Sequence, residues 1–383
     1  MIERLLIGLL LSLVVLDSGA AATVGPQPRD LFVSGTDGYH TYRIPALIVT
    51  KQGTLLAFCE GRKNSPSDTG WIDMLLKRST DGGRTWSKQR VVWSDRPNTC
   101  GNPCPVVDRQ TGVIWLLMTW NRGDDEEGHI IARTSKDTRR PFVTRSSDDG
   151  QTWSAAREIT ADVKLADWNW YSTGPGNGIQ LSRGPRKGRL VIPCCHSKTG
   201  AKGVYISHAI YSDDQGKSWR LGGSSPEDGV DECAVVELSD GRLMLNMRSS
   251  GETPHCRRVC FSTDGGETWV DQHPDQTLVE PPCQASLVRY PGPDAGKKSR
   301  LLFSNPANGQ LNQRNRLTVR LSDDEGRTWP VAKLLWAGPS AYSCLAALPD
   351  GSIGCLYEAG QKHPYEKILF AGLTLDWLSG GGD

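Results

Sequence analysis

Residues 79–86 read Ser79-Thr80-Asp81-Gly82-Gly83-Arg84-Thr85-Trp86, and this stretch decides the fold because its pattern returns four times further along the chain. The later copies, in which Ser, Asp, Gly and Trp keep the same spacing, begin at Ser146, Ser212, Ser262 and Ser322. The aspartate of such a motif accepts hydrogen bonds from its own turn, the glycine adopts left-handed backbone and the tryptophan packs into a sheet. We therefore interpret the motifs as hairpin turns of a repeated β-structure and not as a set of catalytic aspartates.

A second repeat consists of two apolar strands joined by a turn that contains Gly, Asp or Ser. The six copies span residues 43–62, 102–121, 178–196, 232–248, 284–305 and 342–358. Each of the first five is followed by one of the Ser-to-Trp motifs, so that a unit contains two hairpins, and alternation such as that of residues 241–248 is typical of strands. Four-stranded units of this size are typical of propeller blades. The sequence therefore predicts an all-β fold, a six-bladed β-propeller of four-stranded antiparallel blades.

The two ends of the chain complete this prediction. The sixth unit lacks the Ser-to-Trp motif, and only one convincing strand, near residues 368–375, follows it, so we expect residues 31–33 to supply the missing strand and close the ring. Residues 1–22 contain an apolar run followed by Ala20-Ala21-Ala22, which predicts a signal peptide, because the run is shorter than the roughly 20 residues that a membrane span needs. Residues 23–383 are expected to form one secreted or periplasmic propeller domain without a membrane span.

The composition narrows the classes of partner and cofactor. Lys and Arg number 44 against 43 Asp and Glu, and a net charge of +1 gives no reason to expect nucleic acid or an anionic membrane as partner. The 11 cysteines form no pair of CxxC motifs at zinc spacing, and no HExxH motif is present, so neither a metal nor an organic cofactor is expected. Cys100 with Cys104, or Cys256 with Cys260, could form disulfides, whereas other cysteines lie within apolar runs, and the sequence does not assign the pairing.

Polar residues gather at one end of the predicted inner strands. These strand ends carry Arg43, Asn102, Glu232, Gln284 and Tyr342 at the start of a hairpin, and Glu60, Arg62, Trp120, Asn121, His196, Arg248, Asn305 and Glu358 at its return. One such residue alone is more commonly a solvated strand end. The inner strands of a propeller surround one axis, however, so these ends meet, and arginines brought together repel one another unless carboxylates or an anionic ligand compensate them. The sequence therefore predicts an anion-binding site at this end.

The segments at these strand ends resemble a known family. Tyr42-Arg43-Ile44-Pro45, the Ser-to-Trp motifs (Asp boxes), residues 57–62 (Ala-Phe-Cys-Glu-Gly-Arg) and Ala341-Tyr342-Ser343 resemble the bacterial and animal exo-α-sialidases, in order and over essentially the whole mature chain. Asp boxes alone also occur in propellers with other functions, so the other segments make the resemblance specific. It implies a monomeric hydrolase, without cofactor, that removes terminal α-linked sialic acids from glycoproteins, glycolipids or oligosaccharides.

The resemblance also assigns a carboxylate clamp. Arg43, Arg248 and Arg314 would hold the carboxylate of the sugar, since planar guanidinium groups match a carboxylate better than lysine does. Glu358 would orient Arg43, and Glu60 would be a further supporting carboxylate. Arg316 stands where the family often has a small polar residue and adds a charge near Arg314, so it is the competing candidate for the third arginine.

The substrate's own charge explains the catalytic residues that the resemblance implies. Sialic acid carries a carboxylate on its anomeric carbon, so an anionic nucleophile would approach against that charge, whereas a neutral tyrosine would not. Tyr342 would be the nucleophile of a retaining mechanism with a tyrosine-linked intermediate, Glu232 its base and Asp68 the general acid and base. Asp73 is the competing acid, but it lies in an expected strand.

The remaining residues that match the family are expected to contact the sugar. Arg62, Asn102 and Gln284 would bind its acyl and glycerol arms, and Trp120, Trp170 and Tyr171 would wall the pocket, although aromatic residues more often serve packing. Three alternatives stay open: a trans-sialidase, a glycosidase of a related keto acid, and a non-catalytic propeller that binds sialylated glycans. The last would not need the catalytic residues to be kept together.

Overall fold

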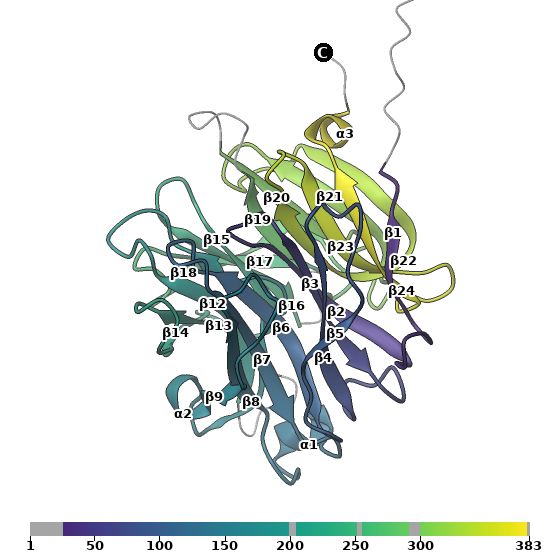
Figure 1. Cartoon of the computed structure of the whole chain (residues 1–383). Helices are drawn as coiled ribbons and strands as arrows, with labels where there is room; N and C mark the ends of the chain where they lie inside the picture. The colour runs from purple at the N-terminus through teal and green to yellow at the C-terminus, as the bar shows by residue number, and fades with distance from the viewer. Residues whose placement is uncertain (1–25, 199–203, 251–254, 291–298, 381–383) are drawn as a thin grey trace, which may run out of the picture.

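The computed structural model describes residues 26–198, 204–250, 255–290 and 299–380. These form an almost entirely β structure, in which the strands run through the whole body of the molecule (Figure 1). Within these ranges the helices are short: α1 (Glu127–Ala132), α2 (Thr160–Val163) and α3 (Leu375–Ser379). The predicted all-β class is confirmed, and the predicted signal peptide of residues 1–22 lies outside the described residues.

The described strands form four sheets, of eight, five, four and seven strands, which we divide along the chain into six antiparallel groups. The first two are β2 (Thr41–Val49), β3 (Leu55–Arg62), β4 (Ile72–Ser79) and β5 (Arg90–Trp93), then β6 (Thr99–Val107), β7 (Ile114–Asn121), β8 (Arg140–Ser146) and β9 (Arg157–Glu158). The next two are β10 (Trp168–Thr173), β11 (Ile179–Gln180), β12 (Leu190–Lys198), β13 (Tyr205–Ser212) and β14 (Arg220–Ser224), then β15 (Val230–Glu237), β16 (Leu243–Ser249), β17 (Cys256–Ser262) and β18 (Val270–Val279). The last two share the long strand β22 (Val331–Ala347), which follows β19 (Ser286–Tyr290), β20 (Arg300–Pro306) and β21 (Asn315–Ser322) and precedes β23 (Ile353–Ala359), β24 (Lys367–Leu373) and β1 (Arg29–Val33). The eight-stranded sheet joins the first two groups through one parallel pairing of β4 with β6, and the seven-stranded sheet contains the last two groups.

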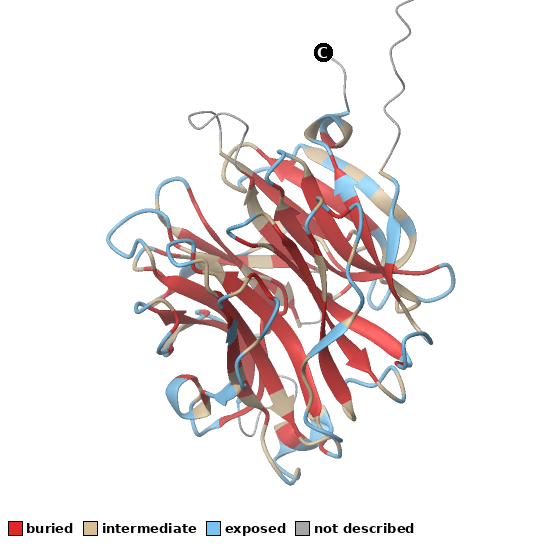
Figure 2. Cartoon of the chain, viewed as in Figure 1, coloured by how far each residue is buried: buried red, intermediate tan, exposed pale blue. Residues whose placement is uncertain are grey.

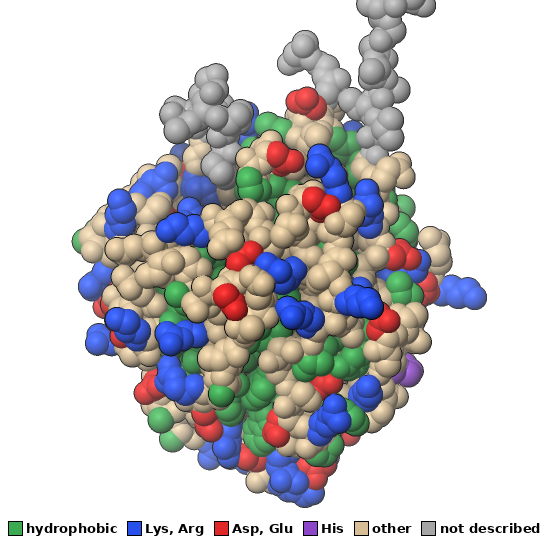
Figure 3. Space-filling view, in the orientation of Figure 1, with side chains coloured by type: hydrophobic (Ala, Val, Ile, Leu, Met, Phe, Trp, Pro, Cys, Tyr) green, Lys and Arg blue, Asp and Glu red, His purple; other side chains and the backbone are tan. Residues whose placement is uncertain are grey.

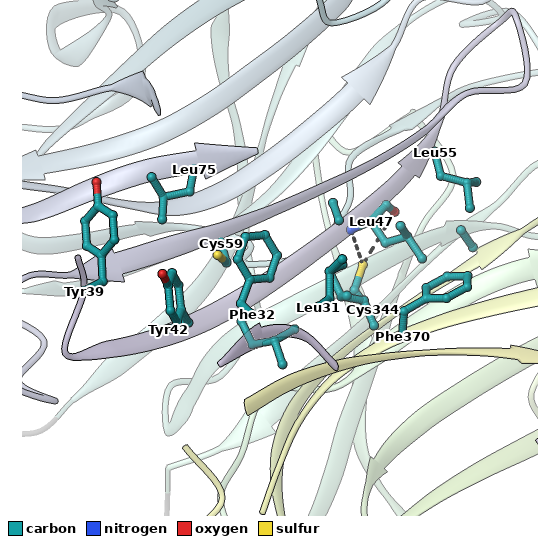
Figure 4. Packing of buried hydrophobic residues seen from close by; sticks show 14 of the residues in the cluster. Leu31, Phe32, Tyr39, Tyr42, Leu47, Leu55, Cys59, Leu75, Cys344 and Phe370 are labelled. Atoms are coloured by element: carbon teal, nitrogen blue, oxygen red, sulfur yellow. Dashed lines mark hydrogen bonds between the residues drawn. The ribbon is translucent and has the colours of Figure 1, made fainter. Parts of the chain in front are cut away.

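The first described strand pairs with the last. β1 lies antiparallel to β24, with Phe32 opposite Ile368, as predicted from the strand missing in the sixth unit. Figure 4 shows Leu31 and Phe32 of β1 in one apolar cluster with Cys344 and Phe370 from the C-terminal part of the chain. The two ends of the chain are therefore joined both by hydrogen bonds and by a shared core.

The third group differs from the prediction. A first strand beginning at residue 178 was expected, but the strand that starts the group is β10, which ends at Thr173, and a turn separates it from the short strand β11. Gly174 and Gly176 in this turn have φ of +61° and +134°, values that favour glycine, so the strand cannot continue through them.

The Asp boxes close turns, as their composition predicts. Asp81 accepts hydrogen bonds from the backbone N–H of Thr85 and the hydroxyl of Ser79, at 2.9 and 2.8 Å, and Gly83 has φ of +86°. The same two contacts recur at Asp148, Asp214, Asp264 and Asp324. The interpretation of these aspartates as structural is confirmed.

The interior is apolar, and the surface carries mixed charge. Strand residues are buried along most of their length while the loops are exposed (Figure 2), and all 11 cysteines are buried and unpaired, so neither possible disulfide forms. Basic and acidic side chains alternate over the face shown in Figure 3, in keeping with the net charge of +1. Any attraction for an anion therefore has to come from a local arrangement.

Two buried histidines contact each other in the third group. The Nδ1 atoms of His196 on β12 and His208 on β13 are 3.1 Å apart, and the Trp168 ring stacks on His196 at 3.4 Å between centroids. Burial lowers the pKa of His196 to about 3 and that of His208 well below its ordinary value. Both imidazoles are therefore neutral in the folded protein.

This pair makes stability depend on pH. Below pH about 6.5 these histidines become protonated in the unfolded chain but stay neutral in the folded chain. For each of the two histidines, the free energy of unfolding should therefore fall by up to about 1.4 kcal/mol for every pH unit below about 6.5. Urea unfolding at pH 7 and pH 5 checks this: His208→Gln should lose less stability between the two pH values than the wild type or the exposed control His273→Gln. Identical losses in all three proteins would contradict the expectation.

Candidate active site

A cleft of about 900 Å³ lies where the predicted strand ends meet. The predicted site residues that line it are Arg43, Glu60, Arg62, Asp68, Asn102, Trp170, Glu232, Arg248, Arg314 and Tyr342. They come from β2, β3, β6, β10, β15, β16 and β22 and from two loops, which are distant in sequence. The structure therefore brings together most of the residues that the sequence selected.

A tyrosine and a glutamate form a close pair inside the cleft. The hydroxyl of Tyr342 on β22 lies 2.7 Å from both carboxylate oxygens of Glu232 on β15. Arg248 on β16 donates to Glu232 at 2.9 Å and to the Tyr342 hydroxyl at 3.3 Å. Burial and the Glu232 charge raise the pKa of Tyr342 well above its ordinary value, and burial also raises the pKa of Glu232, against the effect of Arg248. The tyrosine is thus protonated at rest and has a base in contact with its proton.

Arg43 is held from behind by a buried carboxylate. Its Nε and Nη2 donate to the two oxygens of Glu358 on β23 at 3.1 and 3.3 Å, and Glu358 also accepts the backbone N–H groups of Ile44 and Tyr342 at 2.8 and 3.1 Å. The guanidinium lies 3.9 Å from the centroid of the Tyr365 ring. Glu358 does not line the cleft, and this single carboxylate orients both Arg43 and the start of the Tyr342 segment.

Arg314 lies in the cleft and has no carboxylate partner among the described residues, a property that it shares with the buried Arg139. Arg314 donates to the carbonyl of Pro282 at 3.0 Å and to the hydroxyl of Tyr365 at 3.1 Å, both neutral. Arg316, the other candidate, is exposed, has φ of +60° and does not line the cleft. The structure thus places Arg314 in the site, where its charge favours an anionic ligand.

Asp68 lies at the mouth of the cleft, with 62% of its side chain exposed. It contacts Arg62 at 2.5 Å and Arg43 at 3.5 Å. Desolvation by the surrounding protein raises the pKa of Asp68, but the positive charges of Arg62 and Arg43 have the larger effect and lower the pKa to about 2. Asp73, the competing candidate, is buried and accepts hydrogen bonds from Tyr39 and Trp71, so it holds the strand and not a ligand.

The wall near Asn102 is built on a buried arginine. Asn102 donates its backbone N–H to Glu60 at 2.9 Å, and its side-chain oxygen accepts from Arg139. Arg139 in turn lies 4.0 Å from the centroid of the Trp170 ring. Asn102 and Trp170 are therefore fixed relative to each other, although no signal in the sequence pointed to Arg139.

Three residues that were predicted to contact the sugar, Gln284, Trp120 and Tyr171, do not line the cleft. Gln284 is buried and bonds the Pro175 carbonyl and the Ser343 backbone. Trp120 donates its indole N–H to Asp95. Tyr171 faces the core beside His208, as expected from the alternation of side chains along β10, where its neighbour Trp170 faces the cleft.

Other lining residues were missed by the sequence reasoning. Glu127 of α1 accepts a hydrogen bond of 2.5 Å from Tyr205, and burial raises its pKa to about 7. Tyr365 and Glu127 lie outside the strand repeats, so the periodicity of the sequence gave no signal for them. Asp231 directly precedes Glu232, so its position in the repeat could have identified it as a lining residue.

Among the residues that the structure describes, no cluster of His, Cys, Asp and Glu suited to a metal ion is found. None of the described helices is long and apolar enough to span a membrane.

Known proteins are similar to this chain in sequence and in fold. The family model for the BNR repeat-like domain matches residues 53–355. The sialidase of Micromonospora viridifaciens is 39% identical in an alignment 381 residues long, which covers 95% of this chain and 56% of that protein. Sialidase-2 of Cricetulus griseus is 30% identical in an alignment that covers 91% of this chain and 95% of that protein. The solved structure of the Hadza microbial sialidase Hz136 superposes with a TM-score of 0.82 at 32% identity, covering 92% of this chain and 69% of that one.

These matches show the family. The chain belongs to the sialidase family, and it spans little more than half the length of the Micromonospora relative.

Proposed function

We propose that this chain is an exo-α-sialidase that hydrolyses terminal α-linked sialic acids of glycoconjugates with retention of configuration. The observation that carries the proposal is the Tyr342–Glu232 pair, with both oxygens at 2.7 Å from the hydroxyl, in one cleft with Arg43, Arg248 and Arg314. A core or packing tyrosine has no need of a buried carboxylate and three arginines around it.

The six antiparallel groups support a six-bladed propeller as the framework. Each group would be one blade, and the pairing of β1 with β24 would close the ring. We also propose that residues 1–22 direct export and that the mature domain acts as a monomer.

The clamp positions the substrate by charge. The sugar carboxylate would accept hydrogen bonds from Arg43, Arg248 and Arg314, which places the anomeric carbon beside the Tyr342 hydroxyl. Glu358 keeps Arg43 in place, and the absence of a carboxylate partner for Arg314 among the described residues leaves its charge for the ligand. This arrangement selects a sugar acid over a neutral sugar.

The reaction then proceeds in two displacements. The Tyr342 oxygen attacks the anomeric carbon while Glu232 accepts the phenol proton, and the glycosidic bond breaks as Asp68 donates a proton to the leaving oxygen. Water next attacks the anomeric carbon, Asp68 accepts the proton of that water, and Glu232 returns its proton to the departing phenolate. Two inversions give net retention.

Asp68 needs substrate to become an acid. At a pKa of about 2, Asp68 is ionised in the free protein, because the charges of Arg62 and Arg43 lower its pKa by more than desolvation raises it. A bound carboxylate compensates the charge of Arg43, which removes part of that stabilisation and raises the pKa of Asp68. Proton donation is thereby linked to an occupied clamp.

This role predicts a dependence on the leaving group. Asp68→Asn should lower kcat/KM for sialyllactose by about 10²–10⁴-fold, the usual contribution of a general acid. The loss should be much smaller with 4-methylumbelliferyl α-N-acetylneuraminide, because its phenolate leaves without protonation. Initial rates on both substrates check this, with Asp73→Asn as the control that keeps their ratio. Equal losses on both substrates for Asp68→Asn would exclude it as the acid.

The proposed function is tested by real-time NMR of residues 23–383 with 4-methylumbelliferyl α-N-acetylneuraminide. Release of the α-anomer of free sialic acid, followed by mutarotation, is the expected result. First appearance of the β-anomer would overturn retention, and absence of any released sugar from folded protein would overturn hydrolysis of this substrate. Addition of lactose distinguishes a trans-sialidase, which would form sialyllactose.

A further inference from the structure

One buried segment contacts two of the strands and one of the loops that carry cleft residues. Residues 280–284 (Glu280-Pro281-Pro282-Cys283-Gln284) connect β18 to β19 without regular secondary structure. All are buried except Pro282, which lines the cleft and is partly exposed. Because no sheet pairing fixes this segment, its conformation depends on the side-chain and backbone hydrogen bonds that it makes.

Glu280 ties the segment to the strand of Arg248. Its Oε1 accepts the backbone N–H of Ser249, the residue after Arg248, at 2.6 Å, and its Oε2 accepts from Arg257 on β17 at 2.8 Å. Arg257 also donates to the carbonyl of Cys283 at 2.8 Å and to Asn246 on β16 at 2.7 Å. The ion pair thus fixes the segment at both Glu280 and Cys283.

The same segment contacts Arg314 and the Tyr342 strand. The carbonyl of Pro282 accepts from Nη2 of Arg314 at 3.0 Å. The side-chain oxygen of Gln284 accepts the backbone N–H of Ser343, the residue after Tyr342, at 3.1 Å, while its amide donates to the Pro175 carbonyl at 3.0 Å. The segment therefore reaches Arg314 directly and Arg248 and Tyr342 through their chain neighbours.

The ion pair itself argues for a positioning role. Neither the Arg257 nor the Glu280 side chain is exposed, and a fully buried pair contributes little to stability because desolvation offsets the attraction between the charges. Such a pair does fix geometry, since moving either partner leaves a buried charge unpaired. Glu358 acts in the same way on Arg43 and on the backbone of Tyr342.

We propose that the Arg257–Glu280 ion pair and residues 280–284 position Arg248, Arg314 and Tyr342 relative to one another. The proposal rests on the proposed function for its kinetic consequences. The ion pair fixes the positions of Arg248 and Arg314, which Glu358 does not contact. Gln284 fixes the position of the strand that carries Tyr342. Arg257, Glu280 and Gln284 are positioning residues, because none of them lines the cleft.

The double variant Arg257→Met/Glu280→Leu tests the ion pair. Replacement of both charges by apolar residues of similar size avoids an unpaired buried charge, so the protein should fold. KM for sialyllactose should rise by about tenfold or more, because weakened clamp binding is common to the ground and transition states. Inhibition by free N-acetylneuraminate should weaken by the same factor. The value of kcat should also fall, because Arg248 contacts Glu232 and the Tyr342 hydroxyl.

The control is Arg189→Met, which removes another buried arginine. Arg189 pairs with Asp213 and Glu267, and none of the three lines the cleft. This variant should lose thermal stability and keep both kinetic constants. If the folded double variant keeps the KM of the wild type, or if Arg189→Met shifts KM equally, the positioning role is overturned.

Gln284→Met is an independent test, since it removes both polar atoms at similar volume. It should lower kcat about tenfold with little change in KM, because it disturbs the Tyr342 strand and not the clamp. Unchanged kcat in the folded variant would remove Gln284 from the proposal.

A structural readout separates this inference from the proposed function. Crystal structures of the wild type and of the double variant should differ by more than about 1 Å at the guanidinium groups of Arg248 and Arg314. A wild type without sialidase activity would defeat the proposed function alone. Unmoved guanidinium groups would defeat the positioning role alone.

Discussion

Tyr342→Phe should lower kcat for sialyllactose by about 10³-fold or more and leave the protein folded. The change removes the one oxygen that can form a bond to the anomeric carbon, and the side chain otherwise fills the same volume. Glu232 would lose its contact to the hydroxyl but keep its ion pair with Arg248 at 2.9 Å, so no buried charge becomes unpaired. A large kinetic loss at small structural cost is the mark of a residue that acts in the reaction.

The measurement is the initial rate at saturating sialyllactose, together with the melting temperature. Tyr171→Phe is the matched control, because Tyr171 is also a buried tyrosine, but its hydroxyl contacts His208 in the core. The control should keep its rate within about threefold, since it changes nothing in the cleft. A Tyr342→Phe rate within tenfold of the wild type would mean that the hydroxyl is not the nucleophile.

The repeated elements could be predicted from sequence because each repeat contains all the residues that determine its local structure. Each Asp box contains its hydrogen-bond acceptor, its glycine and its packing tryptophan within eight residues, so each turn can be predicted without knowledge of the rest of the chain. The strand ends that begin or close a hairpin can be predicted in the same way. The repeats therefore predict that Arg43, Glu232, Arg248 and Tyr342 meet at one end of the fold, and these residues lie together in the cleft.

Side-chain direction limited the prediction of the pocket walls. Trp170 and Tyr171 are adjacent in β10, so their side chains point to opposite faces of the sheet, and only Trp170 lines the cleft while Tyr171 packs in the core. Gln284 sits at the expected strand end, yet its amide is used by backbone groups of Pro175 and Ser343. A backbone hydrogen bond to a distant segment leaves no trace in local sequence.

Loops between the repeats hold the residues that were missed. Glu127 lies on the short helix α1, and Tyr365 precedes β24, so neither takes part in a hairpin pattern. Their positions in the cleft follow from how complete units pack against each other, which is a tertiary property. Arg314 is the intermediate case: the resemblance selected it over the neighbouring Arg316, and the local sequence offered no further support for that choice.

Arg314→Met should lower kcat/KM for sialyllactose by about 10²–10³-fold, whereas Arg316→Met should leave it within about twofold. Two charge-assisted hydrogen bonds at about 1.5–3 kcal/mol each account for a loss of this size, at 1.4 kcal/mol per factor of ten, after partial replacement by water. Arg314 suits the test because its known partners, the Pro282 carbonyl and the Tyr365 hydroxyl, are neutral. Loss of Arg43 would instead leave Glu358 as a buried unpaired carboxylate, and misfolding would obscure the kinetics.

The two variants remove the same side chain two positions apart, so differences in net charge cancel between them. Both variants should be assayed for kcat/KM and for inhibition by free N-acetylneuraminate. This inhibitor has the carboxylate but no leaving group, so its affinity reports on the clamp alone and should fall only for Arg314→Met. A greater loss for Arg316→Met would move the third arginine of the clamp to that residue. Equal and small losses would mean that Arg43 and Arg248 hold the carboxylate without a third arginine.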